Sequence, residues 1–123
     1  MKPLSVIVAQ SNAQTGEFLT KSLYNHFRMV HTANNVDELL HSIAKHRADV
    51  AVVDLELAGL KQVEQLTHQF SSTKIVCTHR LADEKIWTDA LAAGAADCCH
   101  SSDVRAIVFA ASNIRPAAHA HAA

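Results

Sequence analysis

The residue with the clearest chemical potential in this chain is Asp54, which ends an otherwise apolar stretch. The segment Ala48-Asp49-Val50-Ala51-Val52-Val53 precedes it, and Leu55-Glu56-Leu57-Ala58-Gly59-Leu60 follows it. This pattern predicts a buried strand that carries one carboxylate at its C-terminal end, then a glycine-containing loop that leads into a helix. In open α/β sheets, ligands bind beyond the carboxyl ends of the strands. Asp54 is therefore the first candidate for a functional residue.

Five short apolar runs, which we expect to be strands, alternate with five segments of helical periodicity. The expected strands are residues 4–9, 29–32, 50–54, 74–78 and 96–100, and the expected helices are residues 15–27, 36–43, 60–70, 83–93 and 104–114. Asn35 with Glu38 three residues later is typical of a helix start, and Gly94 is typical of a helix end. The strict alternation predicts a parallel sheet with helices on both faces. The continuous apolar runs are typical of strands buried on both sides.

The composition indicates a single globular domain without an electrostatic surface for nucleic acid or membrane. The chain has 123 residues, of which 49% are hydrophobic and 19% charged, and its formal net charge is −1. Its basic residues are scattered, so we expect no nucleic-acid partner and no binding to an anionic membrane. The N-terminal apolar run is too short for a signal peptide or a membrane span, which favours a cytoplasmic protein. We expect residues 1–114 to form the domain and residues 115–123 a linker or disordered tail.

The three cysteines are Cys77, Cys98 and Cys99. An odd number with an adjacent pair does not resemble a disulfide framework. His79 lies two residues after Cys77, and His100 directly follows Cys99. Because the two expected strands are neighbours, these side chains could lie close enough to bind a metal ion. The spacing matches no Cys-x-x-Cys pair, and buried free cysteine is a common small apolar residue in strands. We therefore expect no metal site.

Two motifs resemble those of the receiver domains of response regulators. Asp54-Leu55-Glu56-Leu57-Ala58-Gly59 is similar to the receiver phrase of aspartate, three residues, proline and glycine, with Ala58 in place of the proline. Gly94-Ala95-Ala96-Asp97 is similar to the Gly-Ala-x-Asp that leads into the fifth receiver strand. The resemblance covers residues 4–114 and implies an α/β fold of the flavodoxin-like (CheY-like) class. That fold is a three-layer sandwich with a five-stranded parallel sheet of order 2-1-3-4-5 and five helices, and Asp54 stands at the phosphoacceptor position.

The other functional positions that the resemblance implies are mostly changed. A receiver holds Mg²⁺ with the phosphoacceptor and two acidic residues after the first strand, where this chain has Gln10 and Ser11. The lysine expected after the fifth strand is Ser101, whereas the hydroxyl of the fourth strand is retained as Thr78. Asp54 alone is a poor Mg²⁺ site, because that ion takes several oxygen ligands. We therefore expect weak or absent Mg²⁺ binding, no resident cofactor and no enzymatic activity, as in a pseudo-receiver.

A partner surface is expected on the helix of residues 83–93, which carries Trp87, the single tryptophan, with Leu91 four residues later. Tryptophan is enriched among the residues that anchor protein interfaces. The receiver resemblance implies that this face is used for dimers and effectors. We expect a protein partner or an attached output domain, and a homodimer is possible.

The favoured interpretation is a pseudo-receiver of a bacterial response regulator that signals through protein contact with weak or no aspartyl phosphorylation. The first alternative is a functional phosphoacceptor receiver of a two-component system, which would use Asp54. The second alternative is a small flavodoxin-like ligand-binding domain, in which the loop of residues 10–16 could hold a phosphate on the amides of a helix N-terminus. That loop contains neither the Gly-x-Gly-x-x-Gly nor the Walker pattern.

Overall fold

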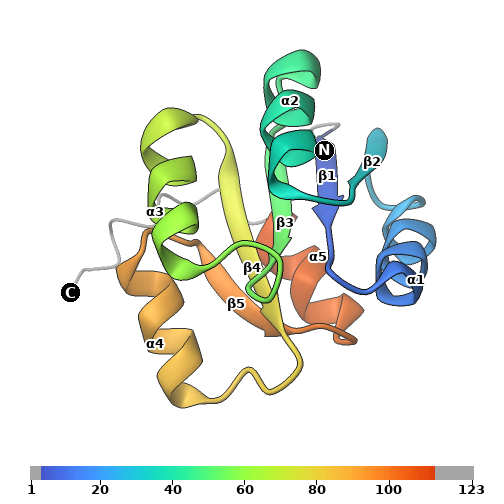
Figure 1. Ribbon diagram of the computed structural model, residues 1–123. Helices are drawn as coiled ribbons and strands as arrows, with labels where there is room; N and C mark the ends of the chain where they lie inside the picture. Colours follow the sequence, from blue (N-terminus) through green and yellow to red (C-terminus); the bar gives the residue numbers. More distant parts are fainter. Residues whose placement is uncertain (1–3, 113–123) are drawn as a thin grey trace.

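Residues 4–112, which the computed structural model describes, form a five-stranded parallel sheet between two layers of helices (Figure 1). In chain order the elements are β1 (Ser5–Ala9), α1 (Ala13–Leu23), β2 (Met29–Ala33), α2 (Val36–His46), β3 (Val50–Asp54), α3 (Leu60–Gln69), β4 (Lys74–His79), α4 (Glu84–Ala92), β5 (Asp97–His100) and α5 (Val104–Ser112). The strand order is β2-β1-β3-β4-β5. The flavodoxin-like architecture and its 2-1-3-4-5 order are confirmed.

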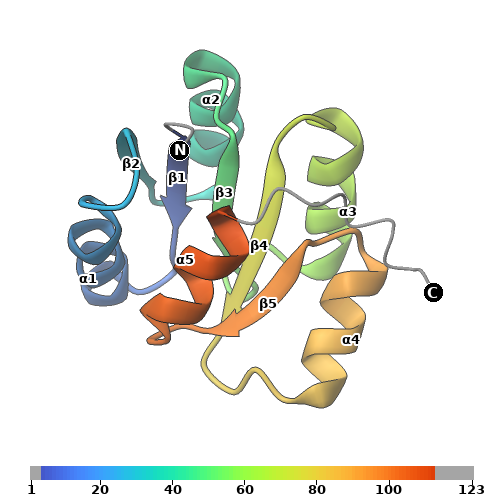
Figure 2. The ribbon, with the colours of Figure 1, turned by 180° about the vertical axis from the view of Figure 1, so that it is seen from behind.

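The core lies on both faces of the sheet, because successive side chains of each strand point in opposite directions. Ile7, Ala51 and Ile75 pack toward α2, α3 and α4, which cover one face. Val6, Val52 and the other alternate residues pack toward α1 and α5, which cover the opposite face (Figure 2). All residues of β1 and β3 are buried. The buried central strand β3 therefore fixes the position of the residue at its end, Asp54.

The predicted strand ends agree with the structure to within one residue, but the first helix is wrong at both ends. In the structure α1 begins at Ala13, two residues before the predicted start. The Asn12 side chain caps the helix there, because it accepts a hydrogen bond from the backbone nitrogen of Thr15 at 3.0 Å. Phe27, which the periodicity placed on this helix, lies beyond its end and still packs against the core. The chain must turn there, because the Arg28 nitrogen donates to the Leu4 carbonyl at 2.9 Å before β2 begins.

Two predicted helix boundaries are confirmed. Asn35 caps α2 by accepting a hydrogen bond from the Glu38 nitrogen at 2.8 Å, and the Glu38 carboxylate reaches back to the Asn34 nitrogen at 2.8 Å. Gly94 follows α4 with a φ of 107°. The predicted end of the fifth helix at Ile114 and the tail of residues 115–123 lie outside the described residues. No helix within residues 4–112 has the length and apolar character needed to cross a bilayer.

Candidate functional site

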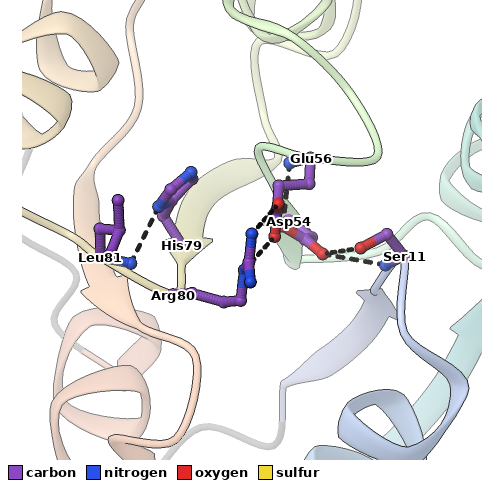
Figure 3. A network of polar contacts seen from close by, with 6 residues as sticks. All are labelled: Ser11, Asp54, Glu56, His79, Arg80 and Leu81. Atoms are coloured by element: carbon purple, nitrogen blue, oxygen red, sulfur yellow. Dashed lines mark hydrogen bonds and ion pairs between the residues drawn. The ribbon is translucent and has the colours of Figure 1, made fainter.

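Asp54 lies at the carboxyl end of the central strand, and its carboxylate is bound by groups of its own chain (Figure 3). One oxygen, Oδ2, accepts hydrogen bonds from the Ser11 backbone nitrogen at 2.9 Å and from the Ser11 hydroxyl at 2.6 Å. The other, Oδ1, accepts from the Glu56 nitrogen at 2.9 Å. The side chain of Asp54 is buried, with 4% of the residue exposed. Three neutral donors therefore hold a carboxylate that has little contact with water.

Gln10 and Thr78 meet beside this carboxylate, from the ends of β1 and β4. The Gln10 amide nitrogen Nε2 donates to the Thr78 hydroxyl at 3.0 Å, and both residues are buried. The Gln10 oxygen Oε1 is buried without a hydrogen-bond partner among the described residues, which costs about 1–3 kcal/mol. The bond spans the sheet from β1 to β4 over β3. Thr78 carries the hydroxyl of the fourth strand that the receiver resemblance implies, and this hydroxyl accepts the hydrogen bond from Gln10.

Ser101 completes the set of predicted positions and brings no charge to it. It is buried just after β5, and its backbone nitrogen donates to the His79 carbonyl at 3.2 Å. Lys74 lies at the opposite end of β4, where its ammonium group donates to the Ala110 carbonyl at the end of α5 at 3.1 Å. Burial lowers the pKa of Lys74. Neither residue supplies a cation to Asp54.

Sequence reasoning missed the ion pair between Glu56 and Arg80, which lies against the site. The Arg80 Nε and Nη2 atoms donate to the two Glu56 carboxylate oxygens at 3.0 and 2.9 Å. The hydrogen bond and charge of Glu56 raise the pKa of Arg80, and the charge of Asp54 adds to this effect. The sequence alone carried no clear signal for this pair, because it depends on the strand register: Asp54 and Thr78 are register partners, Glu56 lies two residues after Asp54, and Arg80 lies two residues after Thr78.

The receiver resemblance implies Mg²⁺, and the donor set can be tested against that ion. Mg²⁺ takes six oxygen ligands in octahedral geometry, usually one or two carboxylates plus waters. Here Ser11 donates its hydroxyl proton to Asp54, and the carboxylate of Glu56 is taken by Arg80. Within residues 4–112, no group of three or more His, Cys, Asp or Glu side chains is arranged to hold a metal ion. The residues present do not fit a Mg²⁺ site.

The three cysteines are buried in β4 and β5 and are poor nucleophiles. Cys77 and Cys98 are register partners, whereas Cys99 belongs to the core cluster on the opposite face of the sheet. Burial raises the pKa of Cys98 to about 11 and that of Cys99 to about 12, and raises the pKa of Cys77 further. Since the thiolate is the reactive form and the metal ligand, these thiols are inert at neutral pH.

The predicted interaction residues lie on α4, away from the Asp54 site. Trp87 is 44% exposed, and its indole nitrogen donates to the Asp97 carboxylate at 3.0 Å. The same Asp97 oxygen accepts from the Cys98 nitrogen at 2.8 Å. Leu91, one turn further along α4, is half-buried. The indole is therefore fixed at the edge of the sheet with much of its ring facing solvent.

A pocket of about 410 Å³ opens between α1 and the ends of β1 and β2. Val8, Ala13, Gly16 and Ala33 give it an apolar wall. Its polar lining comprises Gln10, Asn12, Glu17, Thr20, Lys21, Thr32 and Asn34. The pocket lies beside the first strand-to-helix loop, where the sequence suggested a phosphate.

The comparisons with known proteins identify the fold. No protein-family model matches the chain, and no curated protein sequence is significantly similar to it. A response regulator from Thermotoga maritima has a TM-score of 0.80 and 18% identity, over 91% of this chain and 100% of that one. A response regulator from Burkholderia pseudomallei, with a phosphorylated aspartic acid, calcium ion and citrate, has a TM-score of 0.78 and 22% identity, over 89% of this chain and 67% of that one.

An orphan response regulator of H. pylori has a TM-score of 0.73 and 17% identity, over 85% of this chain and 90% of that one. The fold that these structures share with the chain is the CheY-like receiver fold. Because the identities are low, the similarity defines the architecture, and the function must be argued from the site.

Proposed function

We propose that this chain is a pseudo-receiver, a non-catalytic signalling module that acts by protein contact and does not depend on aspartyl phosphorylation. The observation that carries the proposal is the state of the Asp54 carboxylate. Both of its oxygens are bound by Ser11 and Glu56, and the neighbouring positions Gln10, Ser11 and Ser101 carry no charge. The receiver fold is thus combined with a site that lacks the charged groups of phosphoryl transfer.

The loss of those groups has a large expected effect on the reaction rate. In phosphoryl transfer, catalysis consists almost entirely of positioning and of stabilising the charge on the transferred group. Removal of one preorganised stabilising group commonly costs about 10²–10³ in rate. This chain has a neutral side chain in place of both acidic metal ligands and of the lysine. Attack of Asp54 on a phosphoryl donor would therefore proceed without the cations that neutralise the incoming charge.

The mass of the intact protein after incubation with acetyl phosphate and Mg²⁺ tests this proposal. We expect wild type to keep its mass, as the Asp54→Asn variant does, because the carboxylate is bound and no cation offsets the phosphoryl charge. The structure from Burkholderia pseudomallei carries a phosphorylated aspartic acid, so the fold can bear this modification. An adduct on wild type that is missing from Asp54→Asn would refute the pseudo-receiver and establish the functional phosphoacceptor.

The contact surface that we propose is the exposed part of α4 around Trp87 and Leu91. The indole is held by Asp97 while 44% of the residue remains exposed, so it needs little ordering when a partner binds. An attached output domain or a separate protein would pack against this face.

The pocket beside α1 supports a second candidate function, the binding of a small molecule such as flavin mononucleotide. Under this candidate, adding the flavin is expected to change its absorbance spectrum saturably, and Gly16→Ala is expected to weaken that change. A Cβ on Gly16 would meet only Gln10 side-chain atoms at 3.6 and 4.0 Å, so the variant keeps the fold. A spectrum that the protein leaves unchanged would remove this candidate.

A further inference from the structure

Two histidines from different elements stack on each other between α2 and β2. His31 lies in the middle of β2, and His46 is the last residue of α2. Their ring centroids are 3.8 Å apart, and their ring planes differ by 10°. Both residues are half-buried, and β2 lies at one edge of the sheet (Figure 1). This histidine pair, His31 and His46, therefore joins the end of α2 to the edge of the sheet.

The charged groups that face the histidine pair come from α2 itself. His31 is the register partner of Ile7, which belongs to the core cluster on the face that α2 covers, whereas α1 covers the opposite face. β1 places the uncharged Ile7 beside His31. On α2, the charges of Lys45 and His41 act on His46 together with that of His31, and all three lower its pKa.

The loop after α2 contains one carboxylate, that of Asp49. It accepts a hydrogen bond from the Ser5 backbone nitrogen at 2.9 Å. The charges that shift the pKa of His46 are all of the positive kind, and they oppose a further positive charge there. A histidine in the last turn of a helix is otherwise favoured in its charged form. The surroundings of His46 reverse that usual preference.

Both rings are thus better accommodated as neutral groups. Burial lowers the pKa of His46, and the charges of His31, Lys45 and His41 lower it further. The Nε2 atom of His31 is buried without a hydrogen-bond partner among the described residues. A charged imidazole carries a hydrogen on both of its nitrogens, so protonation of His31 would leave a buried donor without an acceptor.

We propose that the histidine pair is a pH-sensitive contact, which holds the end of α2 on β2 while both rings are neutral and releases it when they are protonated. The inference goes beyond the proposed function and does not depend on Asp54. Asp54 ends β3 at the carboxyl edge of the sheet, whereas α2 ends just before β3 begins. Release would uncover the face of β2 that α2 covers.

The direction of the pH dependence follows from the pKa of His46. In the unfolded chain this side chain takes up a proton near the ordinary pKa of 6.5, and in the folded protein only at lower pH. The unfolded state therefore binds more protons in this range. The contact contributes its full stability above pH 6.5 and loses it as the pH falls through the pKa of the folded protein.

Amide hydrogen exchange of the full chain at pH 7.5 and pH 5.5, corrected for the chemical exchange rate, tests the release. In wild type, the protection of residues 29–33 and 36–46 is expected to fall by about threefold or more at pH 5.5 relative to that of β4. His46→Gln is expected to lose most of this pH dependence. The matched control is His68→Gln, which changes an exposed histidine in the last turn of α3 and is expected to behave as wild type.

A titration of the histidine ring protons by NMR tests the same contact without relying on the stability of a variant. In wild type, His46 is expected to titrate below the ordinary range. His31→Phe keeps a flat ring beside His46 but removes one titrating group, so the pKa of His46 is expected to rise. An ordinary pKa for His46 in wild type, or equal pH dependence of exchange in wild type and His46→Gln, would overturn the proposal.

Discussion

Substitution of Gly94 by alanine is expected to lower the free energy of unfolding by about 3 kcal/mol, from two independent causes. The backbone of Gly94 has a φ of 107°, which residues with a Cβ rarely adopt. A Cβ there would also lie 2.8 Å from the Thr67 hydroxyl oxygen and 3.1 Å from the Thr67 Cγ2. That hydroxyl is held by the Glu64 carbonyl at 2.8 Å, so Thr67 does not move away freely. Urea denaturation followed by circular dichroism measures the change.

Two further variants separate the cost of the positive φ from the cost of the contact with Thr67. Gly16→Ala changes a glycine inside α1 whose added Cβ would make only ordinary contacts, so it is expected to stabilise the protein by roughly 0.5–1 kcal/mol. Thr67→Ala in the Gly94→Ala background removes the hydroxyl oxygen and Cγ2 but keeps the Thr67 Cβ at 3.1 Å, so it is expected to restore much of the steric part and none of the backbone part. A Gly94→Ala variant as stable as wild type would show that this loop adopts another conformation.

Gly94 also shows why so much of the fold could be predicted from the sequence. The ends of α2 and α4 depend on local chemistry, a side-chain cap at Asn35 and a left-handed glycine at Gly94, and both are visible as residue types. The strands were predictable because β1 and β3 are buried on both faces and therefore read as continuous apolar runs.

The end of α1 could not be predicted because it depends on the sheet. Leu19, Leu23 and Phe27 have helical spacing, and all three do pack into one core cluster. Phe27 nevertheless reaches that cluster from a turn, since the backbone of Arg28 must bond to Leu4 so that β2 can pair with β1. Periodicity reports which side chains face the core and not whether the backbone between them is helical.

The site divides in a similar way. The receiver resemblance implied Gln10, Ser11 and Thr78 as neighbours of Asp54, and the fold agrees with this, because the carboxyl ends of parallel strands meet at one edge of the sheet. The hydrogen bonds of these residues could not be predicted, because the pairing of Gln10 with Thr78 depends on side-chain conformations. Glu56 and Arg80 resembled ordinary surface charges until the strand register placed them two positions beyond Asp54 and Thr78.

The combined substitution of Gln10→Asp, Ser11→Asp and Ser101→Lys is expected to convert the chain into a Mg²⁺-dependent phosphoacceptor. The first two changes place an acidic pair beside Asp54, which gives Mg²⁺ three carboxylates. They also remove the Ser11 hydroxyl from Asp54 and free the Thr78 hydroxyl from Gln10. The lysine adds a cation at the end of β5. Labelling of Asp54 by acetyl phosphate, measured by intact mass, is expected to rise by at least about 10²-fold over wild type.

Mg²⁺ is the essential control in this experiment, because three adjacent carboxylates repel one another without a cation. We expect the variant to unfold at a lower temperature in EDTA than in Mg²⁺, and to lose its phosphoryl adduct when Asp54→Asn is added. Phosphorylation of the variant in Mg²⁺ but not in EDTA would show that the wild-type site is unreactive only because it lacks these charged side chains. A variant that folds and binds Mg²⁺ but takes no phosphoryl group would instead place the obstacle in the Arg80–Glu56 pair, which still lies against Asp54.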